Sequence, residues 1–471
     1  MISLKYGIVA VTALVMLSGC TPKMAQVTPP KIGQPPKLLS IPTVENKPVC
    51  DFIKPYDVDY YPQNIATYVN LNASEQINKY AVQQEFDQHF YKPWSYSFAP
   101  ISTKSASWAI SAFKGGFGAN LQRLPATWFT QMEEQSNFEA YSTINRYAIT
   151  TRWMSMRVFP TNDPLYSNPS RAGGGYPFDL LQNSSVAFNE PVFLSHTSLD
   201  GNWSYVFSNN ASGWVESSGI ALIDPQTISL FKSKKKLFIT DDKVPLVDRD
   251  QQVMAWSRIG MVLPLAGETA EGYTAFAIDS GGNLKELAVP KTSAHVGIDL
   301  INKKTLVQLG NNLMNTTYGW GGMFQERDCS STIRDFAIPF GIFLPRNSKE
   351  QAKRGEIFSF KGLRNEQKIA LIKERGVPFE TILYKKGHVL LYIGTYEDKV
   401  MVMHNIWGVR TRDSRGIAGR AVIGKTVIST LELGKEVENF DPHGMLLSTL
   451  VSMNIFTKSR SGAISFSGEL N

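Results

Sequence analysis

A single cysteine, placed between a glycine-rich loop and a helical segment, constrains this chain more than any other feature. The loop and cysteine read YGWGGMFQERDCSS over 318–331. Apolar residues recur at helical spacing directly afterwards, so we expect a helix that starts near Cys329 and is ended or kinked by Pro339. The unpaired N–H groups and positive dipole end of such a helix stabilise a thiolate, the reactive form of cysteine.

Two structural alternatives remain open for the cysteine. It could be a small buried hydrophobic residue, or it could form a disulfide with Cys50 in an oxidising compartment. The loop glycines at 319, 321 and 322 favour a functional role, because they let the backbone approach a substrate without Cβ clashes and a packed core does not need them. We therefore expect Cys329 to be a nucleophile and Cys50 to be a free, buried thiol.

Two histidines follow the cysteine on what we expect to be neighbouring strands. The segment GHVLLYIGTYEDKVMVMHNIWG (387–408) is typical of a hairpin that turns near Tyr396–Lys399. Such a hairpin returns His404 to the side of His388, and their even separation suits a shared face. His388 would then be the general base and His404 the group that orients it. A zinc site made from the three residues is an alternative, but no paired Cys-x-x-Cys spacing supports it, so we expect no metal.

The first twenty residues are typical of an exported protein. Lys5 precedes an apolar run that is too short to span a bilayer as a mature helix, as in a secretory signal. The residues LSGC (17–20) resemble a bacterial lipobox, which implies cleavage before Cys20 and its lipidation. Thr21, rather than an aspartate, then favours the outer membrane, with the protein facing the periplasm. An ordinary secretory signal with a chance cysteine is the alternative.

The length of 471 residues is too great for one ordinary core, so several domains are expected. A formal net charge of +7 suits a polyanionic surface such as a cell wall or a headgroup layer. No nucleic-acid-binding module is visible, and no nucleic-acid partner is expected.

Short β-rich runs separated by turns fill the middle of the chain. Asp200-Gly201 is a hairpin signal between two of them. The strings SMRVFPT (155–161), DGNWSYVFSNNASGWV (200–215) and RIGMVLPLAG (258–267) resemble the two bacterial SH3-type repeats that precede the catalytic domain of NlpC/P60 peptidases. The resemblance implies two small β-barrels here.

The last third resembles the NlpC/P60 cysteine peptidases themselves, through YGWGG (318–322), DCSS (328–331), LPRNSKEQ (344–351), GHVLLYIG (387–394) and His404. This resemblance implies an α+β chain with a papain-like catalytic domain, preceded by two SH3-like β-barrels and a mainly helical N-terminal segment. The expected segments are a signal peptide (1–19), a Pro-rich tether (20–48), a helical clip (49–145), SH3-like domains (146–225 and 226–292), the peptidase domain (293–455) and a tail (456–471).

The resemblance also implies roles for individual residues. Cys329 would be the nucleophile, His388 the base and His404 the polar third member. Tyr318 would sit at the oxyanion with the Cys329 backbone N–H. The peptide groove would be lined by Asp328, Ser330 and Ser348, while Asp163 and Glu216 are candidates to meet a substrate amine.

The order of domains resembles the wall-recycling γ-D-glutamyl-L-diamino-acid endopeptidases. It implies a monomeric, cofactor-free cysteine peptidase that cuts the γ-D-glutamyl–diaminopimelate bond of peptidoglycan stem peptides with a free N-terminal L-alanine. A long loop from Ile357 to Tyr384 is expected to reshape the groove. Two alternatives stay open: another cell-wall amide hydrolase of the muramoyl-L-alanine amidase type, and a non-catalytic wall-binding lipoprotein.

Overall fold

The computed structural model describes residues 56–70, 79–299 and 301–458. The signal peptide, the tether, Cys20, Cys50 and nearly all of the tail lie outside these residues, so the predictions made for them stay predictions. Within the described ranges, no helix is both long enough and apolar enough to cross a membrane.

The N-terminal segment is built from short helices that brace the rest of the protein at separate places. Asp57 Oδ2 accepts hydrogen bonds from the backbone N–H and the hydroxyl of Thr430. Further along, the Trp94 indole donates to the carbonyl of Ala148 at 2.9 Å. The segment is therefore a brace between parts of the chain. Its elements are α1 (Tyr56–Tyr60), η1 (Ile65–Thr67), α2 (Lys79–Phe90), η2 (Lys92–Ser95), α3 (Thr103–Ala106), α4 (Trp108–Ala112), α5 (Ala126–Gln135) and η3 (Phe138–Ala140).

A first seven-stranded antiparallel sheet follows, with strand order β3-β2-β6-β5-β4-β1-β7. Its elements are β1 (Arg146–Thr150), β2 (Met154–Arg157), β3 (Gln182–Val186), β4 (Pro191–Thr197), β5 (Trp203–Phe207), β6 (Ser212–Glu216), η4 (Ser217–Gly219) and β7 (Ile220–Leu222). The predicted Asp200-Gly201 hairpin is confirmed, because His196 of β4 pairs with Tyr205 of β5 across it. Gly201 has a φ of +71°, the left-handed conformation that such a tight turn favours.

A second seven-stranded sheet has the order β10-β9-β13-β12-β11-β8-β14. Its elements are α6 (Pro225–Ser233), β8 (Lys236–Ile239), β9 (Pro245–Val247), β10 (Val253–Trp256), β11 (Val262–Glu268), β12 (Gly272–Ile278), β13 (Leu284–Pro290), η5 (Lys291–Ser293) and β14 (Ala294–Val296). Because β14 pairs with β8, the sheet ends after the domain boundary that we placed at residue 292.

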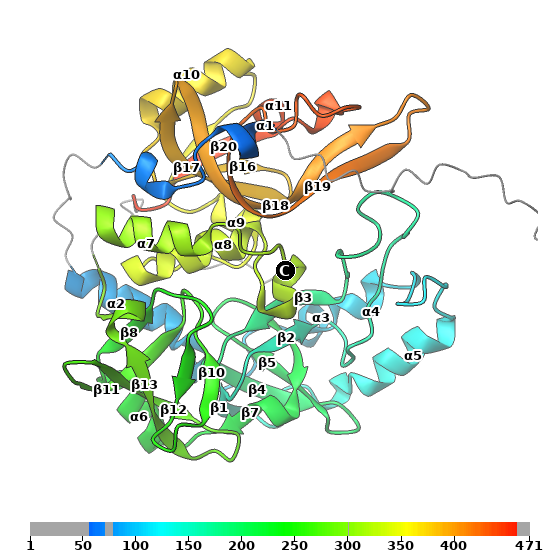
Figure 1. The fold of residues 1–471 in the computed structure, drawn as a ribbon. Helices are drawn as coiled ribbons and strands as arrows, with labels where there is room; N and C mark the ends of the chain where they lie inside the picture. The colour runs from blue at the N-terminus through cyan, green and yellow to red at the C-terminus, as the bar shows by residue number, and fades with distance from the viewer. Residues whose placement is uncertain (1–55, 71–78, 300, 459–471) are drawn as a thin grey trace, which may run out of the picture. The chain divides into compact units, whose positions relative to one another are not determined.

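The C-terminal part contains a six-stranded sheet, β15-β20-β16-β17-β18-β19, with helices on both faces. Figure 1 shows α7 and α8 beneath this sheet and α10 above it. Its elements are α7 (Lys303–Leu313), η6 (Trp320–Gln325), α8 (Cys329–Ala337), η7 (Ile338–Phe340), α9 (Ser348–Gln351), β15 (Glu356–Ser359), α10 (Asn365–Arg375), β16 (Thr381–Lys385), β17 (His388–Tyr396), β18 (Lys399–Arg412), β19 (Ala418–Thr430), η8 (Pro442–Gly444), α11 (Leu446–Thr449) and β20 (Leu450–Ile455).

Alternating strand residues divide the core of this part into two clusters. Val389 and Leu391 of β17 join Phe336 of α8 in one cluster, whereas Leu390 joins Ile372 of α10 in the other. This period-two pattern is what a sheet covered on both faces requires. The predicted α+β class is confirmed by the helices and the three sheets.

The segment from Ile357 to Tyr384 is not the loop that we predicted. It contains most of β15, the whole of α10 and the start of β16. Ile372 and Phe360 are buried in the core cluster of that face, at 0% and 2% exposure. Phe379, Ile382 and Leu383 of the same segment are buried as well, so tertiary packing holds this segment in place.

Candidate active site

The cysteine lies where the sequence places it, at the first residue of α8. Asp328 is the N-cap, and its carboxylate accepts from the Ser331 backbone N–H at 2.9 Å. The Ser331 hydroxyl in turn accepts from the Asp328 N–H, which completes a capping box. The helix ends at Ala337, and Pro339 falls in the 3-10 turn that follows, as predicted. Cys329 is buried, with 7% exposure.

The two histidines meet as predicted. Tyr396 of β17 pairs with Lys399 of β18, so the hairpin turns where we expected. His388 Nε2 lies 2.9 Å from His404 Nδ1, and His404 Nε2 lies 3.1 Å from the Ser429 hydroxyl of β19. The three side chains form a row across three neighbouring strands. His388 Nδ1 is not used within this row, and Ser429 is a further member of the row that the sequence did not suggest.

Burial decides the protonation states of the resting site. Burial and the nearby Asp328 carboxylate raise the pKa of Cys329 to about 12, against a smaller opposite effect of the Val389 N–H. Burial and the charge of Lys385 lower the pKa of His388 to about 3. Both shifts favour the neutral thiol and the neutral imidazole. These shifts oppose the thiolate expected at the helix start, because desolvation penalises the anion more than the Val389 and Ser330 N–H groups stabilise it.

Tyr318 lies beside the cysteine, at the start of an aromatic wall. Burial, and next the proximity of Cys329, raise the pKa of Tyr318 well above its usual value, so its hydroxyl remains a hydrogen-bond donor. Its ring centroid is 5.9 Å from that of Trp407 on β18. Trp407 also faces Phe178 of the first sheet's loop at 6.2 Å, and Phe178 faces Trp320 at 5.1 Å. Sequence reasoning missed Phe178 and Trp407, because they come from separate segments.

Two of the predicted groove residues are buried and hydrogen-bonded within the protein. Asp328 and Ser330 are 8% and 4% exposed. The Arg346 guanidinium donates to both carboxylate oxygens of Asp328, at 3.1 and 2.7 Å, and to the Ser330 hydroxyl at 3.0 Å. Arg346 also donates to Ser184 of the first sheet. The contact of Asp328 and Ser330 with a substrate stays a prediction, whereas their role in fixing the start of α8 is visible.

The remaining predicted residues lie farther out. Ser348 is the first residue of α9, which Gln351 ties to α8 through a hydrogen bond to the Ser330 carbonyl at 2.8 Å. The Glu216 carboxylate is neutralised by Arg152 at 2.7 Å and accepts from Asn162, so it is not a free acceptor for an amine. The Asp163 side chain is exposed.

The loop glycines serve a purpose that differs from the one predicted. A Cβ on Gly321 would lie 2.6 Å from the Gln182 carbonyl, and one on Gly322 would collide with the Ser185 hydroxyl. Both glycines have positive φ, +59° and +87°. They therefore let the loop lie against β3 of the first sheet, and the space beside them is not open to a substrate.

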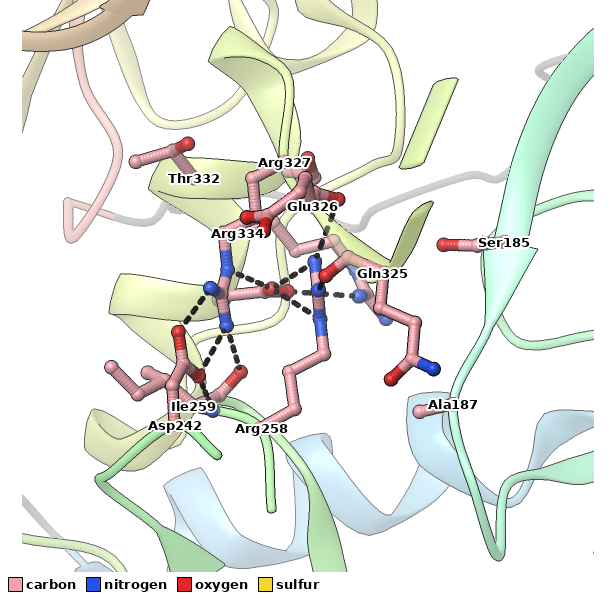
Figure 2. A network of polar contacts seen from close by, with 12 residues as sticks. Ser185, Ala187, Asp242, Arg258, Ile259, Gln325, Glu326, Arg327, Thr332 and Arg334 are labelled. Atoms are coloured by element: carbon pink, nitrogen blue, oxygen red, sulfur yellow. Dashed lines mark hydrogen bonds and ion pairs between the residues drawn. The ribbon is translucent and has the colours of Figure 1, made fainter. Parts of the chain in front are cut away.

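A buried charge network holds the same loop from the other side. The Arg327 guanidinium is bidentate to Asp242, at 2.5 and 2.9 Å, and donates to Asp335 of α8 at 2.7 Å. Arg258 donates to Asp335 and to the carbonyls of Gln325 and Glu326. Figure 2 shows Arg327 directed at Asp242 and Arg258 directed at the loop backbone. The segment that follows β8 thus positions the residues immediately before the cysteine.

Two known domain families match the chain. Residues 9–141 match the NLPC_P60 stabilising domain, N-terminal, and residues 164–216 match the SH3 domain of SH3b1 type. The SH3 match falls on the first sheet, and the assignment of the second sheet to the SH3 type stays a prediction. No curated protein is significantly similar in sequence.

Solved structures add a likeness over the whole fold. An NlpC/P60 endopeptidase from Photobacterium damselae subsp. piscicida is 24% identical, with a TM-score of 0.75 over 85% of this chain and 98% of that one. A Bacillus cereus ATCC 10987 protein of the NlpC/P60 family is 14% identical, with a TM-score of 0.44 over 66% of this chain and 99% of that one, which is too low to argue from. The first likeness shows the fold.

Proposed function

We propose that this chain, which has the accessory domains and the fold of the NlpC/P60 family, is a cysteine endopeptidase of bacterial cell-wall peptides. The family and the fold support a cell-wall hydrolase. The finer proposal is hydrolysis of the γ-D-glutamyl–diaminopimelate bond in stem peptides with a free N-terminal L-alanine. The observation that carries the cysteine-peptidase chemistry is the row His388–His404–Ser429 beside a cysteine at the start of a helix, whereas the choice of bond rests on the resemblance in domain order.

The reaction proceeds through a thioester. The Cys329 sulfur attacks the scissile carbonyl carbon while its proton passes to His388 Nδ1. The carbonyl oxygen becomes an oxyanion, which accepts hydrogen bonds from the Tyr318 hydroxyl and the Cys329 N–H. The protonated His388 then gives its proton to the leaving amine. Water, deprotonated by His388, attacks the thioester and releases the acid, which restores the thiol.

The neutral resting state makes substrate binding part of the activation. Because both the thiol and the imidazole resist ionisation in the buried site, charge separation occurs only when the oxyanion donors are engaged. His404 Nδ1 accepts the hydrogen bond from His388 Nε2–H and so keeps His388 Nδ1 free of a proton, as a base for the thiol. The Ser429 hydroxyl holds the His404 ring in the same way, through a hydrogen bond with His404 Nε2.

The test is digestion of defined muropeptides, analysed by mass spectrometry. We expect release of L-Ala-D-Glu from peptides with a free amine, and loss of that release in Cys329→Ala with folding and wall binding retained. Cleavage between the sugar and L-alanine would support an amidase instead. Full activity in Cys329→Ala would refute the mechanism, and an inactive wild type that binds wall fragments would support a binding lipoprotein.

We also propose that Cys20 carries a lipid anchor and that the protein faces the periplasm from the outer membrane. The proposal is supported by LSGC at 17–20 and Thr21. Metabolic labelling with a radioactive fatty acid should mark the wild type and leave Cys20→Ser unlabelled. Equal labelling of both would contradict it.

A further inference from the structure

A basic side chain, that of Lys385, lies beside His388. Lys385 is the last residue of β16 and pairs directly with His388, the first residue of β17. Residues directly opposite each other on antiparallel strands project their side chains from the same face. Lys385 is therefore a cross-strand neighbour of the proposed base, on the side away from His404.

Two arginines face each other on the next hairpin. Arg410 of β18 and Arg420 of β19 are register partners, an arrangement in which like charges repel. Arg410 forms an ion pair with Asp441 at 3.1 Å, but Asp441 also forms an ion pair with Arg412 at 3.4 Å. Within the described part of the chain, Arg420 donates to the neighbouring Gly419 carbonyl, at 2.9 Å. Near Arg410 and Arg420 the hairpin therefore carries more positive than negative charge.

Neither Lys385 nor Arg420 forms an ion pair with a carboxylate among the residues that the structure describes, although the charge of Asp441 also acts on Arg420. Lys385 is only partly exposed, and burial together with the charges of Arg410 and Arg420 lowers its pKa. The Arg420 guanidinium also extends to the loop of the first sheet, since its Nη2 would lie 3.8 Å from a Cβ on Gly173. Partly buried cations without counter-charges are costly to keep unless a ligand supplies the anion.

We propose that Lys385 and Arg420 form a subsite that binds a carboxylate of the peptide substrate beside His388. This inference rests on the proposed function, because stem peptides carry several carboxylates around the scissile bond. A carboxylate bound there would balance the charge that opposes protonation of His388. The enzyme would thus select anionic peptides and become a better proton acceptor only once such a peptide is in place.

The experiment compares stem peptides that each carry a carboxamide in place of one carboxylate. With wild-type protein, kcat/KM should fall about 10- to 100-fold for one amidated position, as for the loss of a hydrogen-bonded charge pair. In Lys385→Met and Arg420→Gln the preference for the free carboxylate at that position should shrink to a few-fold. Lys386→Met is the matched control, because Lys386 is the exposed neighbour of Lys385 and should keep the wild-type preference.

The ratio between two substrates is insensitive to a general loss of folding, which lowers both values together. Equal cleavage of all amidated peptides by the wild type would overturn the subsite while leaving the proposed function intact. An unchanged preference in both variants would overturn it as well. Failure of the wild type to cleave any of the peptides would overturn the proposed function, and the subsite with it.

Discussion

Removal of Asp242 should loosen the loop that carries the residues before Cys329. Asp242 accepts both Nη atoms of Arg327, at 2.5 and 2.9 Å, and the Ile259 N–H at 2.7 Å. The Arg327 side chain is only 2% exposed, so it cannot recover these bonds from water. After Asp242→Ala, Asp335 is the one remaining carboxylate in ion-pair contact with Arg327 among the described residues, and Arg258 shares it at 3.1 Å.

The expected cost follows from the uncompensated charge. Breaking a buried pair by removing one partner costs about 3–5 kcal/mol, and the surviving Asp335 places this case near 3 kcal/mol. The cost should appear as a lower free energy of local opening in the loop 319–328. A change of about 3 kcal/mol corresponds to exchange of its backbone amides about 100-fold faster. The kcat/KM should fall with it, because the same loop positions Tyr318 and Cys329.

Hydrogen–deuterium exchange with mass spectrometry measures the opening locally, which avoids assuming a single unfolding step for a chain of several domains. The matched control is Glu286→Ala, which breaks an ion pair with Arg249 that is 79% exposed on the arginine side. Exposed pairs contribute at most about 1 kcal/mol. If Asp242→Ala and Glu286→Ala changed exchange in 319–328 equally little, the reasoning about Arg327 would be wrong.

Three further outcomes are expected. Burial raises the pKa of Cys329 to about 12, so iodoacetamide should alkylate Cys329 at pH 7 more slowly than it alkylates a free cysteine. The alkylation rate should increase as pH rises. A rate independent of pH between about 5 and 9 would instead indicate a resting ion pair of thiolate and imidazolium. His404→Ala should lower kcat by about 100-fold or more while His404→Gln, which can still bond to His388, retains more activity; equal losses would remove the orienting role. His196 is 0% exposed, and burial lowers its pKa to about 4. Between pH 6.5 and 4 the unfolded chain therefore binds a proton at this histidine that the folded chain does not bind. The free energy of unfolding should fall by about 3 kcal/mol as pH falls through that window. The stability against urea should decrease less between pH 7 and pH 4.5 for His196→Gln than for the exposed-site control His443→Gln. Equal decreases in the two variants would contradict this.

The helix that starts at Cys329 and the histidine hairpin could be predicted because their signals are local. Apolar spacing after the cysteine and Pro339 define α8, and the turn near Tyr396–Lys399 returns His404 to His388. Both depend on residues close together in the chain, for which periodicity and turn chemistry suffice.

The contacts that hold the residues around Cys329 in place could not be predicted, because the residues that make them meet only after folding. Arg346 reaches Asp328 and Ser184, and Asp242 reaches Arg327, across separations that leave no periodic signal. The stretch from Ile357 to Tyr384 was misread as a loop for a related reason. Its helix α10 is stabilised by burial of Ile372 against distant strands, and Phe360, just after β15, is buried in the same cluster.

The sequence by itself determined the order of the chemical groups: a thiol at a helix start and two imidazoles on one hairpin. Tertiary structure decided which charge states are favoured, because burial of Cys329 raises the pKa of its thiol and favours the neutral form. It also decided that Gly321 and Gly322 face the first sheet, and that Lys385 lies directly opposite His388 on the neighbouring strand. Burial and charge balance depend on which distant segments surround a residue, and only the packed chain sets that.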